Sequence, residues 1–200
     1  VTHELKTPLA ANKLYIQTVT KRELSKEQSN ELLQKAIDEN TRLERMIDNI
    51  LNASRLENNA LQPILESFEV ATVFAQIQQR FQTLSGNPNI QLSVEKGTTM
   101  NADRSMIETI MNNLVENAVK YAGREKEIVM YARQDQGKCI FGVRDFGPGV
   151  PKEQRIEIFQ KFFRAQNEET RSQKGTGLGL FIVQQLVNIQ NGNVVCLENE

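Results

Sequence analysis

The segment Asn113-Leu114-Val115-Glu116-Asn117-Ala118-Val119-Lys120-Tyr121 lies in a stretch whose apolar spacing predicts a helix over about 103–122. A carboxamide oxygen suits Mg²⁺, a lysine can meet phosphate, and a tyrosine can pack a base. The alternative is a solvated helix face with asparagine as filler. The expected core stripe is Ile107, Ile110, Met111, Leu114 and Ala118. The polar side chains on the neighbouring face are Asn113, Asn117, Lys120 and Tyr121.

Downstream, Asp145-Phe146-Gly147-Pro148-Gly149 follows residues 139–145, which alternate as a strand does. An aspartate at a strand end can accept a hydrogen bond from an exocyclic amine such as N6 of adenine. Gly147 and Gly149 let the backbone approach a planar ring. A simple tight turn is the alternative.

A second glycine-rich segment, Gly175-Thr176-Gly177-Leu178-Gly179-Leu180, opens a helix expected over about 176–190. Glycines at a helix N-terminus expose N–H groups and the positive end of the helix dipole, which favour phosphate. No strand leads into the segment within a βαβ unit, and no G-K-[ST] closes it, so it is neither a dinucleotide fingerprint nor a P-loop. A glycine-rich hinge is the alternative.

The polar stretch 164–174 before this segment is predicted to be a mobile lid. Its cationic residues are Arg164, Arg171 and Lys174. Three phenylalanines precede it, and we expect them to anchor the lid in the core: Phe159, Phe162 and Phe163.

Residues 1–62 contain no glycine and one early proline, which is a helical composition. Ser25 is a predicted N-cap with Gln28 as its capping-box partner, so a turn over 20–25 separates two helices. Each helix carries an apolar seam with an asparagine, Asn12 or Asn40, that can fix the register. Two such stripes cannot be buried by one hairpin, which predicts a homodimeric four-helix bundle.

His3 points away from the first seam, beside Glu4 and four residues before Thr7. An outward histidine next to a carboxylate can act as a nucleophile at neutral pH, because Glu4 can orient or accept its proton. An ordinary surface histidine is the alternative for this motif alone.

After a linker at residues 61–63 the pattern changes to short strands and intervening helices. The predicted strands are 64–70, 90–95, 128–133, 139–145 and 192–198, and the predicted helices are 71–84, 103–122 and 176–190. The expected fold class is therefore α+β: a helical hairpin over 1–62, followed over 63–200 by an α/β sandwich with one mixed sheet covered by helices.

The composition excludes several classes of protein. The 200 residues include 24 Lys+Arg and 25 Asp+Glu, so the formal net charge of −1 argues against a general nucleic-acid binder. The 2 cysteines and 1 histidine cannot make a disulfide framework or a four-ligand zinc site. No apolar run approaches the roughly 20 residues of a membrane span.

In this order, the motifs resemble the core of a bacterial two-component sensor histidine kinase over essentially all 200 residues. His3-Glu4-Leu5-Lys6-Thr7-Pro8 matches the family's phosphoacceptor box, and residues 113–121 match its N box. Residues 145–149 match the first glycine box, 159–163 the F box and 175–180 the second glycine box. The sequence departs from the family at Gly192-Asn193, where paired glycines are common, and in an expected missing final strand.

The resemblance implies that His3 is autophosphorylated from ATP and that the phosphoryl group passes to an aspartate of a response regulator receiver domain. It implies Glu4 as the general base and Thr7 as the residue that positions water when the regulator is dephosphorylated. It implies a Mg²⁺ ion held by Asn117 with support from Asn113. The implied ATP-binding residues are Asn113, Asn117, Lys120, Tyr121, Asp145, Gly147, Gly149, Arg164, Gly175, Thr176, Gly177, Leu178 and Gly179.

Two other functions stay open at this point. ATPases that resemble gyrase or the heat-shock chaperones place a glutamate four residues before the Mg²⁺ asparagine, whereas this chain has Asn113, a poor base. The other alternative is a dimeric signalling scaffold with weak catalysis. By resemblance we expect a cytoplasmic location, with the full-length protein anchored in the inner membrane.

Overall fold

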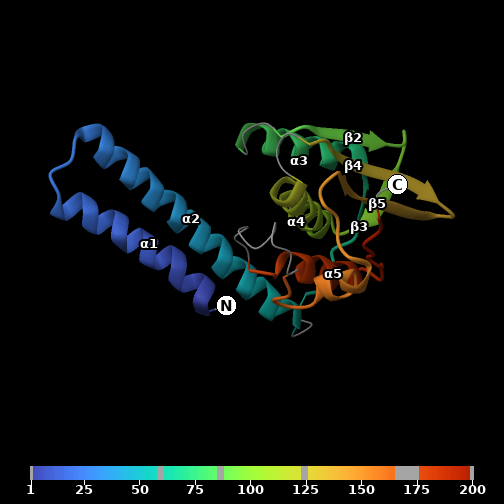
Figure 1. Cartoon of the computed structure of the whole chain (residues 1–200). Helices are drawn as coiled ribbons and strands as arrows, with labels where there is room; N and C mark the ends of the chain where they lie inside the picture. Colours follow the sequence, from blue (N-terminus) through green and yellow to red (C-terminus); the bar gives the residue numbers. More distant parts are fainter. Residues whose placement is uncertain (1, 58–60, 85–87, 123–125, 165–175, 199–200) are drawn as a thin grey trace. The chain divides into compact units, whose positions relative to one another are not determined.

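The computed structural model describes residues 2–57, 61–84, 88–122, 126–164 and 176–198 (Figure 1). The chain forms two compact units, residues 1–54 and 55–200. The second unit begins within a long helix, before the linker at which the sequence analysis sets the domain border.

Helices α1 (Thr2–Lys21) and α2 (Lys26–Glu57) form the predicted hairpin (Figure 1). The capping box at its turn is confirmed atom by atom. The N–H of Ser25 donates to Oε1 of Gln28 at 3.1 Å, and the N–H of Gln28 donates to Oγ of Ser25 at 3.2 Å. Two N–H groups at the start of α2 are thereby satisfied.

The two asparagines predicted to lie in the seams meet in the hairpin. Asn12 is 7% exposed, and its Nδ2 donates to Oδ1 of Asn40 on the opposite helix. Even so, large apolar side chains remain on the hairpin surface, each between 44% and 61% exposed: Leu9, Leu14, Ile16, Leu33, Ile37, Ile47 and Leu51. An apolar surface of this extent is typical of an interaction site.

The second unit contains a mixed sheet, as predicted. Strand β4 (Ile128–Asp135) lies in its centre, parallel to β2 (Ile90–Val94) and antiparallel to β5 (Lys138–Asp145). A separate antiparallel pair joins β1 (Glu66–Glu69) to β3 (Thr99–Ala102). Strand β3 was not predicted, because Met100 is its only large apolar residue and the pattern is therefore weak.

The predicted strand over 192–198 is wrong, because this segment pairs with no strand in the part of the chain that the structure describes. Its alternating residues favour an extended backbone, but a strand also needs a neighbour to satisfy its N–H and C=O groups.

Helices α3 (Val70–Leu84) and α4 (Arg104–Ala122) pack against the mixed sheet, and α5 (Gly179–Ile189) packs against α4 (Figure 1). Alternate residues of β4 face the helices and are buried, namely Ile128, Met130 and Ala132. Two short 3₁₀ helices, η1 (Lys152–Gln154) and η2 (Glu157–Phe159), lie between β5 and α5 in the chain. Among the described helices, none has the length and apolar character needed to cross a membrane.

The core stripe of α4 agrees with the prediction except at one position. Ile107, Ile110, Met111 and Ala118 are buried, but Leu114 is only half-buried and Val115 is fully buried instead. At this turn the buried position is one residue further along, or about 100° around the helix, while Met111 and Ala118 on either side keep the predicted stripe. Asn113 and Asn117 stay partly accessible on the adjacent face.

Candidate functional site

The polar face of α4 approaches the first residue of α5. A Cβ added at Gly179 would lie 2.9 Å from Oδ1 of Asn113 and 4.0 Å from Nδ2 of Asn117. Only a glycine permits this approach without a shift of the asparagine side chain. The structure thus brings together two motifs that are more than sixty residues apart in the sequence.

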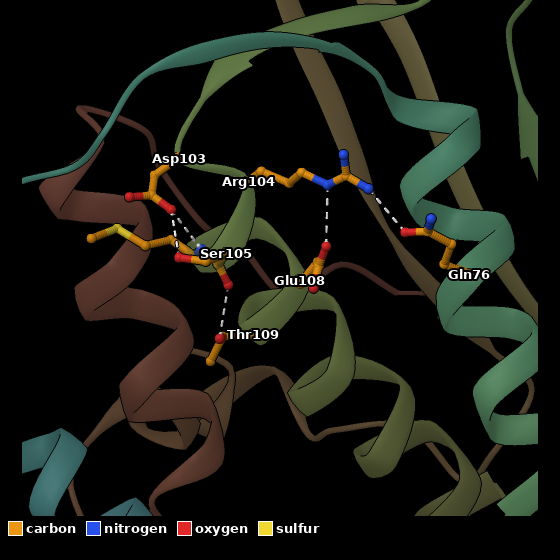
Figure 2. Close-up of polar contacts among 7 residues, drawn as sticks. Gln76, Asp103, Arg104, Ser105, Glu108 and Thr109 are labelled. Atoms are coloured by element: carbon orange, nitrogen blue, oxygen red, sulfur yellow. Dashed lines mark hydrogen bonds and ion pairs between the residues drawn. The ribbon is translucent and has the colours of Figure 1, made fainter.

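The side chain of Asn113 is held by the preceding turn of its own helix. Its Nδ2 donates to the carbonyl oxygen of Thr109 at 2.9 Å. Oγ1 of Thr109 donates in turn to the carbonyl oxygen of Ser105 at 2.9 Å (Figure 2). With its amide nitrogen engaged, Asn113 directs its carboxamide oxygen towards Gly179. Thr109 was not among the predicted site residues, although its position four residues before Asn113 is the signal for such a bond.

Helix α5 starts at Gly179, three residues later than predicted. Its N-cap, Leu178, provides no side-chain cap, and the N–H of Leu178 donates instead to Oγ1 of Thr176 at 3.3 Å. The first N–H groups of any α-helix lack intrahelical partners and carry the positive end of its dipole. Next to the carboxamide of Asn113, this helix end is suited to an anionic ligand.

Gly177, just before α5, packs its backbone against the phenylalanine segment. Its φ is +66°, and a Cβ there would lie 2.7 Å from backbone atoms of both Phe162 and Phe163. The N–H of Phe162 donates to the carbonyl oxygen of Gly177 at 2.9 Å. The phenylalanine segment and the second glycine segment are therefore joined backbone to backbone, immediately outside residues 165–175.

Of the three phenylalanines expected to anchor the lid, only Phe159 is fully buried; Phe163 is half-buried and Phe162 is 41% exposed. The expected lid over 164–174, including Arg171 and Lys174, lies outside the described residues except for Arg164, which is exposed. Gly175 also lies outside them.

The turn after β5 packs against the C-terminal end of α4. Oδ1 of Asp145 accepts a hydrogen bond from the N–H of Gly147 at 2.9 Å, and a Cβ at Gly147 would lie 3.0 Å from Cα of Ala122. Nζ of Lys126 donates to the carbonyl oxygen of Phe146 at 2.8 Å, which gives the turn a further contact. Gly149 has a φ of +73° and open space around it.

Lys120 and Tyr121 contact each other at this end of α4. Nζ of Lys120 donates to the hydroxyl of Tyr121 at 2.9 Å and lies 4.4 Å from the centre of its ring. Tyr121 is 37% exposed, so its ring is available to a ligand.

These contacts mark out an elongated site that follows the polar face of α4, which carries Asn113, Asn117, Lys120 and Tyr121. Asn113, next to Gly179, and Ala122, whose backbone contacts Gly147, are nine residues apart, or about 13 Å along the helix axis, although their side chains lie on opposite faces of the helix. One end presents helix N–H groups and carboxamides, and the other presents Asp145 and an aromatic ring. An extended ligand with an anionic end and a flat, hydrogen-bonding end fits this arrangement.

The donor set also limits which metal the site can hold. Within the described residues, no three His, Cys, Asp or Glu side chains gather to form a metal site. Asn113 and Asn117 provide hard oxygen donors but no charge, so they fit a Mg²⁺ ion that takes its other ligands from water and from an anionic ligand.

On the first unit, the backbone of His3 and Glu4 lies in α1, and their side chains are outside the described part of the structure. Thr7 is exposed on the same helix. The structure therefore brings together the predicted residues of α4, the turn after β5 and the start of α5.

Comparisons with known proteins agree with both units. Residues 1–59 match the family model "His Kinase A (phospho-acceptor) domain", and residues 102–200 match "Histidine kinase-, DNA gyrase B-, and HSP90-like ATPase". The chain is 28% identical over 196 residues to the sensor-like histidine kinase SenX3 of Mycolicibacterium smegmatis. The match covers 97% of this chain and 51% of SenX3, so the chain spans about half the length of that relative.

Two solved structures share the fold. The histidine kinase ThkA, solved in complex with the response regulator protein TrrA, matches with a TM-score of 0.75 at 23% identity, over 100% of this chain and 56% of that one. Full-length ShkA, solved in complex with AMPPNP, matches with a TM-score of 0.71 at 24% identity, over 97% of this chain and 41% of that one. The chain therefore belongs to the two-component sensor histidine kinases.

Proposed function

We propose that this chain is an ATP-dependent protein-histidine kinase that phosphorylates His3 and passes the phosphoryl group to an aspartate of a response regulator. We assign dimerisation and phosphotransfer to residues 1–62 and ATP binding to residues 63–200. The observation that carries the proposal is the elongated site on α4, because its two chemically different ends match the two ends of ATP.

In this proposal the adenine lies at the C-terminal end of α4. Asp145 accepts a hydrogen bond from N6 of adenine, Gly147 and Gly149 allow the turn to approach the ring, and Tyr121 packs beside it. The triphosphate lies at the start of α5, where the backbone of Gly175, Thr176, Gly177, Leu178 and Gly179 surrounds it. Lys120 and Arg164 provide positive charge, and Lys120 exchanges its contact with Tyr121 for a phosphate.

Asn117 and Asn113 would hold Mg²⁺ between this helix face and the phosphates. When bound, the ion neutralises charge on the phosphate oxygens. The chain's own contribution is to orient the carboxamide oxygen of Asn113, through its bond to Thr109, towards the start of α5.

His3 is the phosphoryl acceptor in this proposal. A neutral ring nitrogen attacks the γ-phosphorus, the new N–P bond forms as the bond to the β,γ-bridging oxygen breaks, and ADP leaves. Glu4 accepts the proton from the other ring nitrogen, so the phosphorylated imidazole carries no additional charge. Transfer of this kind depends mainly on positioning and charge neutralisation.

A receiver domain that docks around His3 would then accept the phosphoryl group on its aspartate. The complex of the relative ThkA with TrrA supports a response regulator as the partner. Thr7, four residues after His3, would position water when the regulator is dephosphorylated. We propose a cytoplasmic site of action, with any membrane anchor of the whole protein outside residues 1–200.

We further propose that the exposed apolar stripe of the hairpin is covered by a second copy of this chain. Ile37→Asp is the test, since Ile37 is 56% exposed on that stripe. Removing an isoleucine from both copies costs about 4 kcal/mol, or roughly a 1,000-fold rise in the dimer Kd. Sedimentation equilibrium at micromolar protein concentration should therefore show Ile37→Asp as a monomer.

Lys35→Asp is the matched control for this dimer test. Lys35 lies two residues earlier, about 200° around the helix, and its side chain is 50% exposed. Its substitution changes the charge by more than Ile37→Asp does, but on the opposite face. Loss of the dimer in both variants, or in neither, contradicts the assigned interface.

Asp145→Asn tests the adenine contact. The amide keeps an oxygen for the N–H of Gly147 but is a weaker acceptor for an exocyclic amine, so ATP affinity should fall by about 1–3 kcal/mol. The ratio of the affinity for ATP to the affinity for GTP should also fall, because guanine carries a carbonyl where adenine carries that amine. Calorimetric titration measures both, with Asp135→Asn at the exposed end of β4 as the control. Unchanged nucleotide preference in Asp145→Asn would count against the assignment.

The ATPase alternative is not favoured by the site. Asn113 donates through its amide to Thr109, and a carboxamide cannot take a proton from water as a glutamate does. The match of residues 1–59 to the phosphoacceptor family also gives the hairpin a function that a simple ATPase lacks.

A further inference from the structure

Asp103 lies immediately before α4, and its two carboxylate oxygens accept hydrogen bonds from two different parts of the chain. Oδ1 accepts hydrogen bonds from Oγ of Ser105 at 2.7 Å and from the N–H of Met106 at 3.1 Å, which caps the helix (Figure 2). Oδ2 accepts the N–H of Ile64 at 2.9 Å, from a residue 39 positions earlier. The residue is 7% exposed. The cap alone would need only one of the oxygens.

The contact with Ile64 holds the linker by its backbone. The side chain of Ile64 is 80% exposed, so burial of that side chain does not fix the segment. Pro63 has no N–H, which makes the N–H of Ile64 the first donor after it. A charged acceptor strengthens the bond. Partial burial raises the pKa of the Asp103 carboxyl, but the hydrogen bonds from Ser105, Ile64 and Met106 outweigh it, so the net pKa is lowered and the group stays ionised.

Asp103 also contacts the far end of α5. Its own N–H donates to Oε1 of Gln190, the C-cap residue of α5, at 2.7 Å. One residue therefore joins the linker, the start of α4 and the end of α5. The same two helices carry the proposed ATP site at Asn113 and Gly179.

We propose that Asp103 is a positioning residue for phosphoryl transfer, because it fixes the backbone of the linker, at Ile64, to the start of α4 and so limits the paths that the chain can take between α2 and β1. This inference rests on the proposed function. Without the bond, the first residue of this segment held by the rest of the second unit is Glu66 in β1, two residues further along the chain. A longer and less restricted linker lowers the effective concentration of His3 at the ATP site.

Two substitutions break the bond from its two sides. Ile64→Pro removes the donor, and residue 64 lies outside the helices and strands, so a proline there breaks no helix or ladder hydrogen bond. Asp103→Asn keeps an oxygen for Ser105 and Met106 but turns an amide donor towards the N–H of Ile64. Their controls are Ile64→Ala, which keeps the N–H, and Ser105→Ala, which removes another bond to the same carboxylate.

Autophosphorylation kinetics of the full chain should separate positioning from stability. We expect Ile64→Pro and Asp103→Asn each to lower kcat about threefold or more, with the KM for ATP unchanged. The double variant should show no further loss, because both changes remove the same bond. Ile64→Ala and Ser105→Ala should keep the parent kcat, even where Ser105→Ala lowers Tm.

Amide hydrogen exchange, followed residue by residue by NMR, tests the docking without any kinase activity. The N–H of Ile64 should exchange at least tenfold faster in Asp103→Asn than in the parent and in Ser105→Ala. Equal exchange rates, or equal kcat values for Ile64→Pro and Ile64→Ala in an active parent, would overturn the proposal. A parent that takes up no phosphate refutes the proposed function and the positioning role with it, while the exchange rates still decide whether Asp103 docks the linker.

Discussion

His3→Gln is expected to abolish phosphate incorporation from γ-labelled ATP while nucleotide affinity stays at the parent value. Glutamine is a helix former of similar length, so α1 should persist, but its amide cannot form the N–P bond. His3 is the only histidine in the chain, so no second imidazole can replace it. The measurement is label on the protein at saturating ATP and Mg²⁺.

ATP titration of the same variant is the control for this experiment. The ATP site is built from the second unit, so its affinity should be unchanged by a substitution in α1. Persistent labelling of His3→Gln would refute the assignment of the acceptor. Loss of both labelling and ATP binding would show instead that the substitution damaged the fold.

Gly177→Ala is expected to lower ATP affinity at least tenfold and to reduce stability. Any side chain at a φ of +66° is strained by about 1 kcal/mol. The new Cβ would also lie 2.7 Å from backbone atoms of Phe162 and Phe163, and backbone cannot move aside as a flexible side chain can. The junction with the phenylalanine segment must open, and the start of α5 must shift with it.

Gly137→Ala is the control that separates the effect of backbone strain from the effect of the steric clash in Gly177→Ala. Gly137 has a φ of +78° and no atom within 4 Å of an added Cβ, so it carries the strain without the contact. It should lose about 1 kcal/mol of stability and keep ATP affinity. Thermal unfolding with and without ATP measures both effects. Equal behaviour of the two variants would mean that the contact between Gly177 and the phenylalanine segment does not shape the site.

Features set by residues close in the sequence were predictable in atomic detail, and the class of the sheet was predictable from the order of its elements. The capping box of Ser25 and Gln28 involves residues three apart, and both of its bonds are present. Asn12 and Asn40 were predicted to lie in the two seams, and the structure adds that they bond to each other across the hairpin. The mixed sheet is likewise confirmed in β2, β4 and β5.

Other features depend on partners that the sequence pattern does not identify. Residues 192–198 alternate as a strand does, yet they pair with no strand within the described structure. Strand β3 exists because β1 pairs with it, although its four residues show little pattern. Val115 is buried in the core of α4 in place of the predicted Leu114, because packing against neighbouring elements determines which face of the helix is covered.

The site motifs were found in the sequence, but their mutual positions were not. Gly179 was predicted for its exposed N–H groups, whereas the structure adds that its missing Cβ makes room for Asn113. Asp103 was not singled out, because its contacts to Ile64 and Gln190 span 39 and 87 residues. Such long-range contacts become visible only when the fold is known.

The chemical stability of the label tests the central proposal most directly. The chain is incubated with γ-labelled ATP and Mg²⁺, and the labelled protein is then exposed to acid and to alkali. Our account predicts a label that survives alkali and is lost in acid, as a phosphoramidate is, and therefore resides on His3, the only histidine. A label that survives acid and is lost in alkali would place the phosphate on a hydroxyl side chain and contradict the account.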